Sequence, residues 1–188
     1  MLTAHHLSTP ALEAGLEEIR RAPTDRGRVE LIVRRPAKDE RELLDEGTLD
    51  LDEGLVGDTW RVRGSTRTAD GSSHPDMQLN VINARVTELL AGAAHDDWAL
   101  AGDQLYLDLD LSEANLPAGT RLSLGTAIIE ITDQPHRGCK KFSARFGLDA
   151  LRFVNSAVGR ELHLRGVNAR VVVPGAVRTG DVVTKLTA

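Results

Sequence analysis

The sequence predicts a mainly β domain of the barrel or sandwich class with a few short helices. Many short segments alternate polar and apolar residues, and they recur at fairly even intervals along the chain. Gly and Pro residues stand between these segments, where tight turns are expected. Helical patterns are few and do not follow every strand, which argues against a doubly wound parallel sheet.

The first half of the chain begins with a helical pattern and continues with a strand. Thr9-Pro10 suits a helix start, because the first N–H groups of a helix have no partner within it and proline therefore loses no hydrogen bond there. Pro23 ends the helical pattern. From Gly27 the apolar residues recur at every second position until Pro36, which predicts a strand. The remaining predictions are a short helix or surface turn over Lys38–Leu51, a turn at Gly54–Asp58, a polar loop over Arg61–Pro75 and a strand over Met77–Ile82.

The second half has the clearest strand pattern, Gln104–Leu111, in which apolar and polar residues alternate strictly. Asn83 is a suitable cap for a helix that ends at Gly92. The other predicted elements are a hairpin of Arg121–Leu124 and Ala127–Thr132, a loop at Pro135–Cys139, helical segments within Phe142–Ala157 that break at Gly147, and strands at Val167–Val173 and Asp181–Leu186.

Composition limits the class of protein. A chain of 188 residues can bury one core, so we expect a single domain over 1–188, with a helical extension at 1–26 and a barrel core at 27–188. A single cysteine excludes a disulfide within the chain. No apolar run approaches the ~20 residues of a membrane span, and no signal peptide is visible, so we expect a cytoplasmic protein. The net charge of -5 and an aromatic content of 3% argue against nucleic acid as a partner.

The segment Gln134–Phe142 (QPHRGCKKF) carries the strongest chemical signal. It holds the only cysteine, Cys139, together with His136, Arg137, Lys140 and Lys141, and the two lysines are half of the chain's four. Nearby positive charge stabilises a thiolate and makes it more reactive. Gly138, just before the cysteine, allows the backbone to come close to a ligand or to take an unusual dihedral angle.

The same residues also fit a purely structural interpretation of the segment. A lone cysteine is often a small buried apolar residue, and the cationic side chains could simply be solvated. A Cys–His hydrolase with Cys139 and His136 or His74 lacks a recognised spacing. Asp108 and Asp110 share a strand face that is more typical of solvated residues than of a cation site. Zinc-binding, phosphate-loop and dinucleotide motifs are absent.

The polar loop Arg61–Pro75 is a second candidate binding segment. Loops of this length in a compact domain are usually binding loops or disordered segments. Arg61, Arg63 and Arg67 could contact an anion, and a solvated flexible loop is an equally good interpretation of the composition.

The order of motifs resembles that of the MOSC domain, the C-terminal domain of molybdenum cofactor sulfurases. The resemblance covers about Val29 to Leu186 and rests on GLVGD, the Arg-rich loop, MQLNVINARV, AGDQLYLDLDLSEANLPAGTRLSLGTAIIEIT, QPHRGCKKF and GVNARVVVPGAVRTGDVV in that order. It implies a closed β-barrel of the pyruvate-kinase type. In this family the domain is associated with binding or sulfuration of a molybdenum–molybdopterin cofactor, or with reduction of N-hydroxylated compounds.

The resemblance assigns expected roles to single residues. Cys139 is the candidate sulfur carrier or metal ligand, and His136 or a lysine would stabilise its thiolate. Because the pterin cofactor carries a phosphate, basic side chains are the expected contacts. The expected cofactor-binding residues are Arg61, Arg63, Arg67, Arg137, Lys140, Lys141 and Asn115, with His74 and Asn80 as weaker candidates.

Three functions follow from these expectations. The first is a module that binds the molybdenum cofactor or carries sulfur to it on Cys139, with a cysteine desulfurase or a redox protein as a possible partner. The second is a molybdenum-dependent reductase of N-hydroxylated compounds, and the third is a small-anion binding module without catalysis. The chain departs from its relatives at Gln104 and at His136-Arg137-Gly138, and the aminotransferase-like domain that binds pyridoxal phosphate in the sulfurases has no counterpart here.

Overall fold

The computed structural model describes residues 6–187, and its centre is a closed barrel. Within these residues seven strands follow one another around the barrel in the order β11-β7-β8-β9-β5-β6-β1, and β1 pairs with β11 to close it. All neighbouring pairs are antiparallel except β5 and β6. The strands are β1 (Arg26–Arg34), β5 (Leu79–Asn83), β6 (Leu105–Asp108), β7 (Arg121–Leu124), β8 (Ala127–Ile131), β9 (Val167–Val173) and β11 (Val182–Leu186).

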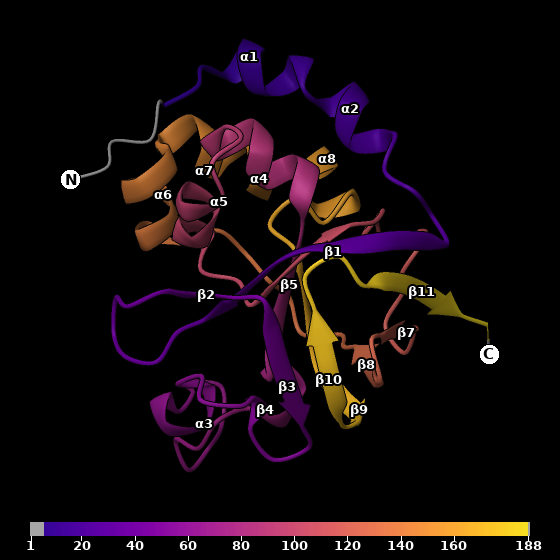
Figure 1. Ribbon diagram of the computed structural model, residues 1–188. Coiled ribbons are helices and arrows are strands. Elements are labelled where there is room, and N and C mark those ends of the chain that lie inside the picture. The colour runs from indigo at the N-terminus through magenta and orange to yellow at the C-terminus, as the bar shows by residue number, and fades with distance from the viewer. Residues whose placement is uncertain (1–5, 188) are drawn as a thin grey trace.

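Most of the helices gather over one side of the barrel, whereas a small second sheet lies on the other side, with the helix at Trp60–Arg63 beside it (Figure 1). That sheet has the order β10-β3-β4. Its strands are β3 (Glu46–Asp50), β4 (Gly54–Leu55) and β10 (Gly175–Arg178), and β2 (Glu42–Leu44) extends the barrel sheet beside β1. The helices are α1 (Thr9–Ala14), α2 (Leu16–Arg20), α3 (Trp60–Arg63), η1 (Pro75–Met77), α4 (Ala84–Ala91), α5 (His95–Trp98), η2 (Ala99–Ala101), α6 (Lys140–Phe146), α7 (Leu148–Asn155) and α8 (Ala157–Glu161).

Alternation along the strands produces two apolar layers. Leu105 and Leu107 of β6 point into the barrel core, while Tyr106 between them packs in the layer under the helices. The helical layer is completed by apolar residues of α4, α6 and α7, among them Val86, Phe146 and Phe153. The period of two in the sequence therefore sorts side chains between the barrel interior and the helix interface.

The predicted mainly β class and the closed barrel are confirmed, and most predicted strands are present. The expectation of a helix or surface turn over Lys38–Leu51 is wrong, because β2 and β3 occupy most of that segment. Its charged residues obscured an alternating pattern in which Gly47 and Leu49 are buried and Thr48 is exposed. The predicted N-terminal helix is divided at Gly15, which lies against Leu89 with no room for a Cβ.

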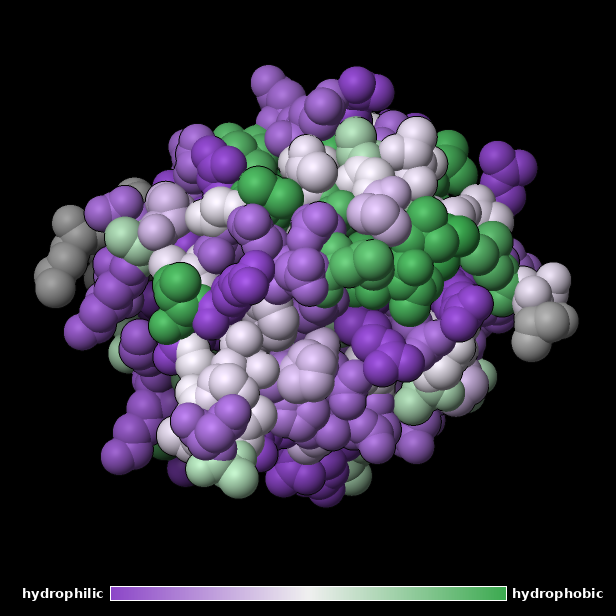
Figure 2. Space-filling model, turned by 90° about the horizontal axis from the view of Figure 1, so that it is seen from below, coloured by the Kyte–Doolittle hydropathy of each residue, from purple (hydrophilic) through white to green (hydrophobic). Residues whose placement is uncertain are grey.

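The end of the barrel away from the helices has a mixed surface. Figure 2 shows hydrophobic side chains gathered in one area of an otherwise largely hydrophilic face. Exposed large apolar residues of the chain include Leu51, Val56, Val173 and Val182. Among residues 6–187, no helix is both long enough and apolar enough to pass through a bilayer.

Candidate functional site

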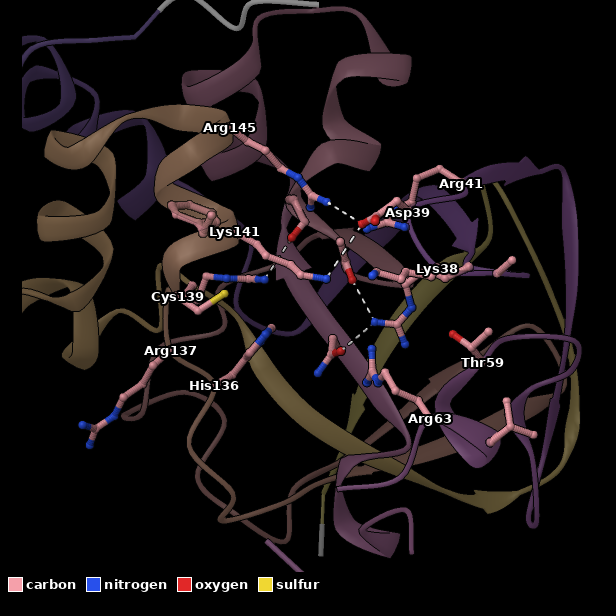
Figure 3. A pocket seen from close by; sticks show the side chains of 18 residues that line it. Lys38, Asp39, Arg41, Thr59, Arg63, His136, Arg137, Cys139, Lys141 and Arg145 are labelled. Carbon is pink, nitrogen blue, oxygen red and sulfur yellow. Dashed lines mark hydrogen bonds and ion pairs between the residues drawn. The ribbon is translucent and has the colours of Figure 1, made fainter. Parts of the chain in front are cut away.

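A cavity of about 540 Å³ lies where the barrel meets the segment that holds Cys139. Lys141 and Arg145 of α6 project from one side, and the β1–β2 loop and α3 form the opposite side, with Lys38, Asp39 and Arg63 (Figure 3). Cationic side chains far outnumber acidic ones in its lining. Among the described residues that line the cavity, eight are Lys or Arg and one is acidic: Arg35, Lys38, Arg41, Arg63, Arg137, Lys141, Arg145 and Arg165 against Asp39.

The crowded cations affect one another. Burial, followed by the charges of Arg145 and Arg35, lowers the pKa of the Arg41 guanidinium. Burial and Arg35 likewise lower the pKa of Arg63. Arginine remains protonated in proteins, so the effect of this crowding is a strongly positive potential in the cavity. Asp39 offsets part of it, since its carboxylate lies 3.8 Å from Lys141 Nζ and 3.9 Å from Arg145 Nη2.

Cys139 lines this cavity and is exposed. It is the residue before α6, so its side chain stands at the point where the loop turns into the helix. The loop is held from behind by Asn155 of α7, whose side-chain amide accepts from Gly138 N at 3.1 Å and donates to Gly138 O at 3.2 Å. A Cβ at Gly138 would lie 2.8 Å from Leu151 Cδ1, so the close approach predicted for this glycine is to α7.

His136 and Asp103 lie deeper in the same wall. The His136 side chain is 12% exposed, and its Nδ1 is 3.5 Å from Asp103 Oδ1 without forming a hydrogen bond. Burial, reinforced by the charges of Arg165, Arg35 and Arg67, lowers the pKa of His136 well below its usual value. The imidazole is therefore neutral at pH 7, and the positive charge near Cys139 comes from side chains such as Lys141.

Arg165 links this wall to α6. Its Nη1 donates to both carboxylate oxygens of Asp103, at 2.9 and 2.7 Å, and its Nη2 donates to Ala101 O. The guanidinium carbon lies 5.1 Å from the centroid of the Phe142 ring. Burial raises the pKa of Asp103 above its ordinary value, and the adjacent Arg165 guanidinium offsets part of that rise.

A buried polar network forms the floor of the cavity. Arg35 donates from its backbone N, Nε and Nη2 to Asp58, and from Nη1 to Asn80 Oδ1 and Gly102 O. Asn80 Nδ2 donates to Asn168 Oδ1, and Asn168 Nδ2 donates to Gln134 O, just before the cysteine loop. Asp58 is the last residue of the GLVGD turn, so that motif anchors a cavity arginine.

The structure brings together part of the set predicted from sequence. Cys139, His136, Arg63, Arg137, Lys141 and Asn80 line the cavity, although Figure 3 shows the Arg137 side chain directed away from the others. Arg61 and Lys140 are exposed and lie outside the lining, and Arg67 reaches only Pro135 O, at 3.4 Å.

Two other candidates lie elsewhere in structural roles. Asn115 donates to Thr24 O and Asp110 O and accepts from Lys185 Nζ, which fixes loops outside the cavity. His74 caps η1 by accepting from Asp76 N.

Four arginines that line the cavity were not among the residues predicted from the sequence: Arg35, Arg41, Arg145 and Arg165. Arg145 follows Lys141 by four positions, so a helix starting at Lys140 places both on one face, and this pair could have been found. Arg35, Arg41 and Arg165 come from segments far apart in sequence, and no local pattern marked them.

Comparisons with known proteins agree with this architecture. The model of the MOSC domain matches residues 72–184. The YuaD protein from Bacillus subtilis is similar in structure, with a TM-score of 0.61 and 17% identity, over 84% of this chain and 94% of that chain. YiiM from Escherichia coli has a TM-score of 0.54 and 21% identity, over 86% and 70% of the two chains. YiiM from Geobacillus stearothermophilus has a TM-score of 0.57 and 15% identity, over 86% and 75%.

No curated protein matches the chain at a significant level. The structural likenesses establish a common fold at low identity. Because the family model covers more than half of the sequence, from the loop before β5 into β11, the chain belongs to the MOSC domain family.

Proposed function

We propose that the cavity binds an anionic molybdenum–pterin cofactor and that Cys139 presents its thiolate to it. The observation that carries the proposal is that cationic side chains, among them Arg63, Lys141 and Arg145, meet an exposed thiol in one cavity of about 540 Å³. Membership of a family linked to the molybdenum cofactor supports the same ligand. Arginine forks suit the oxygens of a phosphate, and the cavity volume lies in the usual range for cofactor sites.

The donor set supports a cofactor over a bare metal ion. Within residues 6–187 no group of three or more His, Cys, Asp or Glu side chains is arranged to hold a metal. Cys139 would therefore add one soft sulfur ligand to a metal that is already held by other donors. A pterin with its own sulfur donors meets that requirement, and the cationic side chains would bind its charged end.

Each residue of the wall has a distinct part in this proposal. Lys141 and Arg145 would bind anionic oxygens from the α6 side and Arg63 from the α3 side. Arg35, whose guanidinium is held by Asp58, Asn80 and Gly102, would add positive potential from the floor. Neutral His136 would give or take a hydrogen bond without adding charge, while Asn155 holds the loop that carries Cys139. When bound, the cofactor supplies two-electron redox chemistry at its metal.

The test is the molybdenum and pterin content of protein purified from a host that makes the cofactor. We expect near-equimolar cofactor in the wild type. Cys139→Ser should lose one sulfur ligand at molybdenum by X-ray absorption while the protein stays folded. Lys141→Gln should bind the cofactor roughly 10- to 150-fold less tightly, because a charge-assisted contact of roughly 1.5–3 kcal/mol is lost.

Lys140→Gln is the matched control, since Lys140 is adjacent and does not line the cavity. Equal loss in both lysine variants would contradict the proposed site. Protein that never acquires molybdenum or pterin would refute cofactor binding. An extra mass of one sulfur on Cys139, removed by reductant, would indicate the sulfur carrier, whereas a bare protein that binds phosphate would indicate the simple anion module.

A further inference from the structure

The turn between β1 and β2 presents a carboxylate to the cations of the cavity. Asp39 is the third residue of a tight turn, Ala37–Glu40, which is closed by a hydrogen bond from Glu40 N to Ala37 O at 3.2 Å. Its φ of +64° lies in the left-handed region, where turns usually carry Gly or Asn. The carboxylate pairs with Lys141 and Arg145 of α6 (Figure 3). An aspartate at this position thus joins the loop to α6 across the cavity.

The cations around Asp39 have donor groups without protein partners. Carbonyl groups of η2 hold two guanidiniums in place, with Arg145 Nη1 donating at 2.6 Å and Arg41 Nε at 3.2 Å. Arg41 Nη2 and Arg145 Nη1 each lie 3.6 Å from the place that a Cβ at Gly102 would take, so the two guanidiniums are neighbours. Among the hydrogen bonds of residues 6–187, none is donated by Arg41 Nη2, Arg145 Nη2 or Lys141 Nζ.

The charges of this cluster do not balance. Burial, followed by the charge of Arg145, lowers the pKa of Arg41, and the charge of Asp39 acts in the opposite direction. One carboxylate thus faces three cations, and the cluster keeps an excess of positive charge. By contrast, Arg35 and Arg165 use their terminal nitrogens on protein acceptors. Donor groups that a ligand can engage are therefore more numerous around Asp39 than beside those two arginines.

The contacts of Asp39 are weak enough for a ligand to replace. Its carboxylate is 3.8 Å from Lys141 Nζ and 3.9 Å from Arg145 Nη2, too far for a hydrogen bond, and its side chain is 59% exposed. Exposed ion pairs of this kind contribute little to stability. A phosphate monoester carries up to two negative charges at neutral pH, and its oxygens form charge-assisted hydrogen bonds of about 2.7–2.9 Å with Arg and Lys. A phosphate group can therefore take over these donors from Asp39.

We propose that Asp39 is an internal competitor for the phosphate group of the ligand. Its carboxylate stands where the phosphate binds, and the turn Ala37–Glu40 must release Lys141 and Arg145 before the ligand engages them. Only the released fraction of molecules binds, so Asp39 lowers the apparent affinity by that fraction. That the phosphate belongs to the cofactor rests on the proposed function, whereas the competition itself does not.

The experiment titrates cofactor-free, isotope-labelled full-length protein with phenyl phosphate and with benzenesulfonate. At about pH 7.5 the first is a dianion and the second a monoanion of similar shape. Nuclear magnetic resonance follows the side-chain signals of Lys141 and Arg145 and the carboxyl carbon of Asp39. Asp39→Asn removes the charge and keeps a residue type that accepts the left-handed conformation. Glu40→Gln is the matched control, since Glu40 is adjacent and exposed and does not line the cavity.

We expect saturable shifts at Lys141, Arg145 and Asp39 with phenyl phosphate. Competition lowers the affinity of every competing anion by the same factor, so Asp39→Asn should tighten both probes equally. The expected gain is about two- to fivefold, as for the loss of an exposed ion pair, and Glu40→Gln should change neither affinity.

Three results would overturn the inference. Repulsion through space acts twice as strongly on the dianion, so a gain for phenyl phosphate near the square of the gain for benzenesulfonate would exclude competition. The second is an absence of tightening in Asp39→Asn, and the third is saturation by phenyl phosphate without a shift at the Asp39 carboxyl carbon.

Molybdenum and pterin content is measured on the same variants. If phenyl phosphate displaces Asp39 in a protein that never acquires the cofactor, the inference stands and the proposed function is removed. If the wild type carries the cofactor but Asp39→Asn tightens neither probe, internal competition is removed and the proposed function stands.

Discussion

Removing the Asp58 carboxylate should destabilise the fold strongly, because it is the counterion of a buried arginine. The side chains of Arg35 and Asp58 are 6% and 0% exposed. Asp58 accepts from Arg35 N, Nε and Nη2 and from Trp60 N, at 2.8–3.0 Å. In Asp58→Ala the guanidinium keeps only the bonds of Nη1 to Asn80 and Gly102. Breaking a buried pair from one side costs about 3–5 kcal/mol.

The measurement is the free energy of unfolding from urea titration, followed by circular dichroism. A loss of about 3–5 kcal/mol corresponds to a fall in Tm of roughly 6–20 °C for a chain of this size. Glu46→Ala is the control, since it removes one partner of the ion pair with Arg178, in which both side chains are about half exposed. Such pairs contribute about 0–1 kcal/mol. A loss below about 1 kcal/mol in Asp58→Ala would refute the reasoning that the pair is buried and irreplaceable.

Two further predictions concern the cavity. Asp39→Asn removes the only carboxylate among the described residues that line the cavity, so inorganic pyrophosphate should bind several-fold more tightly, as measured by calorimetry. Glu40→Gln, the control, should leave the affinity unchanged. Weaker binding of pyrophosphate to Asp39→Asn would contradict the anion site. Because the pKa of His136 is lowered on folding, the unfolded chain takes up a proton first as the pH falls. The free energy of unfolding should therefore decline below about pH 6.5, and it should decline more steeply in the wild type than in His136→Gln. If the urea midpoints of the two proteins changed with pH in the same way, this prediction would be contradicted.

Local patterns were sufficient for the barrel strands and for the segment around Cys139. Strict alternation in QLYLDLDL predicted β6, and that alternation also separates the barrel core from the helix layer. The cluster QPHRGCKKF could be found because its charges and its cysteine are adjacent in the chain. The prediction failed over Lys38–Leu51, where exposed charged residues masked the period of two in β3.

Long-range pairing decided which cations share the cavity. Arg35 and Arg165 lie 130 positions apart, yet both line it, since β1 and β9 belong to one closed barrel. By contrast Asn115, predicted as a ligand contact from its motif, is used to join loops. Only the folded packing distinguishes an arginine that faces a cavity from one that faces solvent, as Arg63 and Arg61 illustrate within a single short helix.

The sequence by itself determined a mainly β domain with its single thiol in a cationic loop, because alternation and local charge are encoded in neighbouring residues. Tertiary structure alone decided that His136 is buried and neutral, that Asp103 and Arg165 lie behind it, and that cationic side chains from distant segments share one cavity. The physical reason is that burial and electrostatic potential depend on segments brought together by barrel closure, and their separation along the chain carries no local signal.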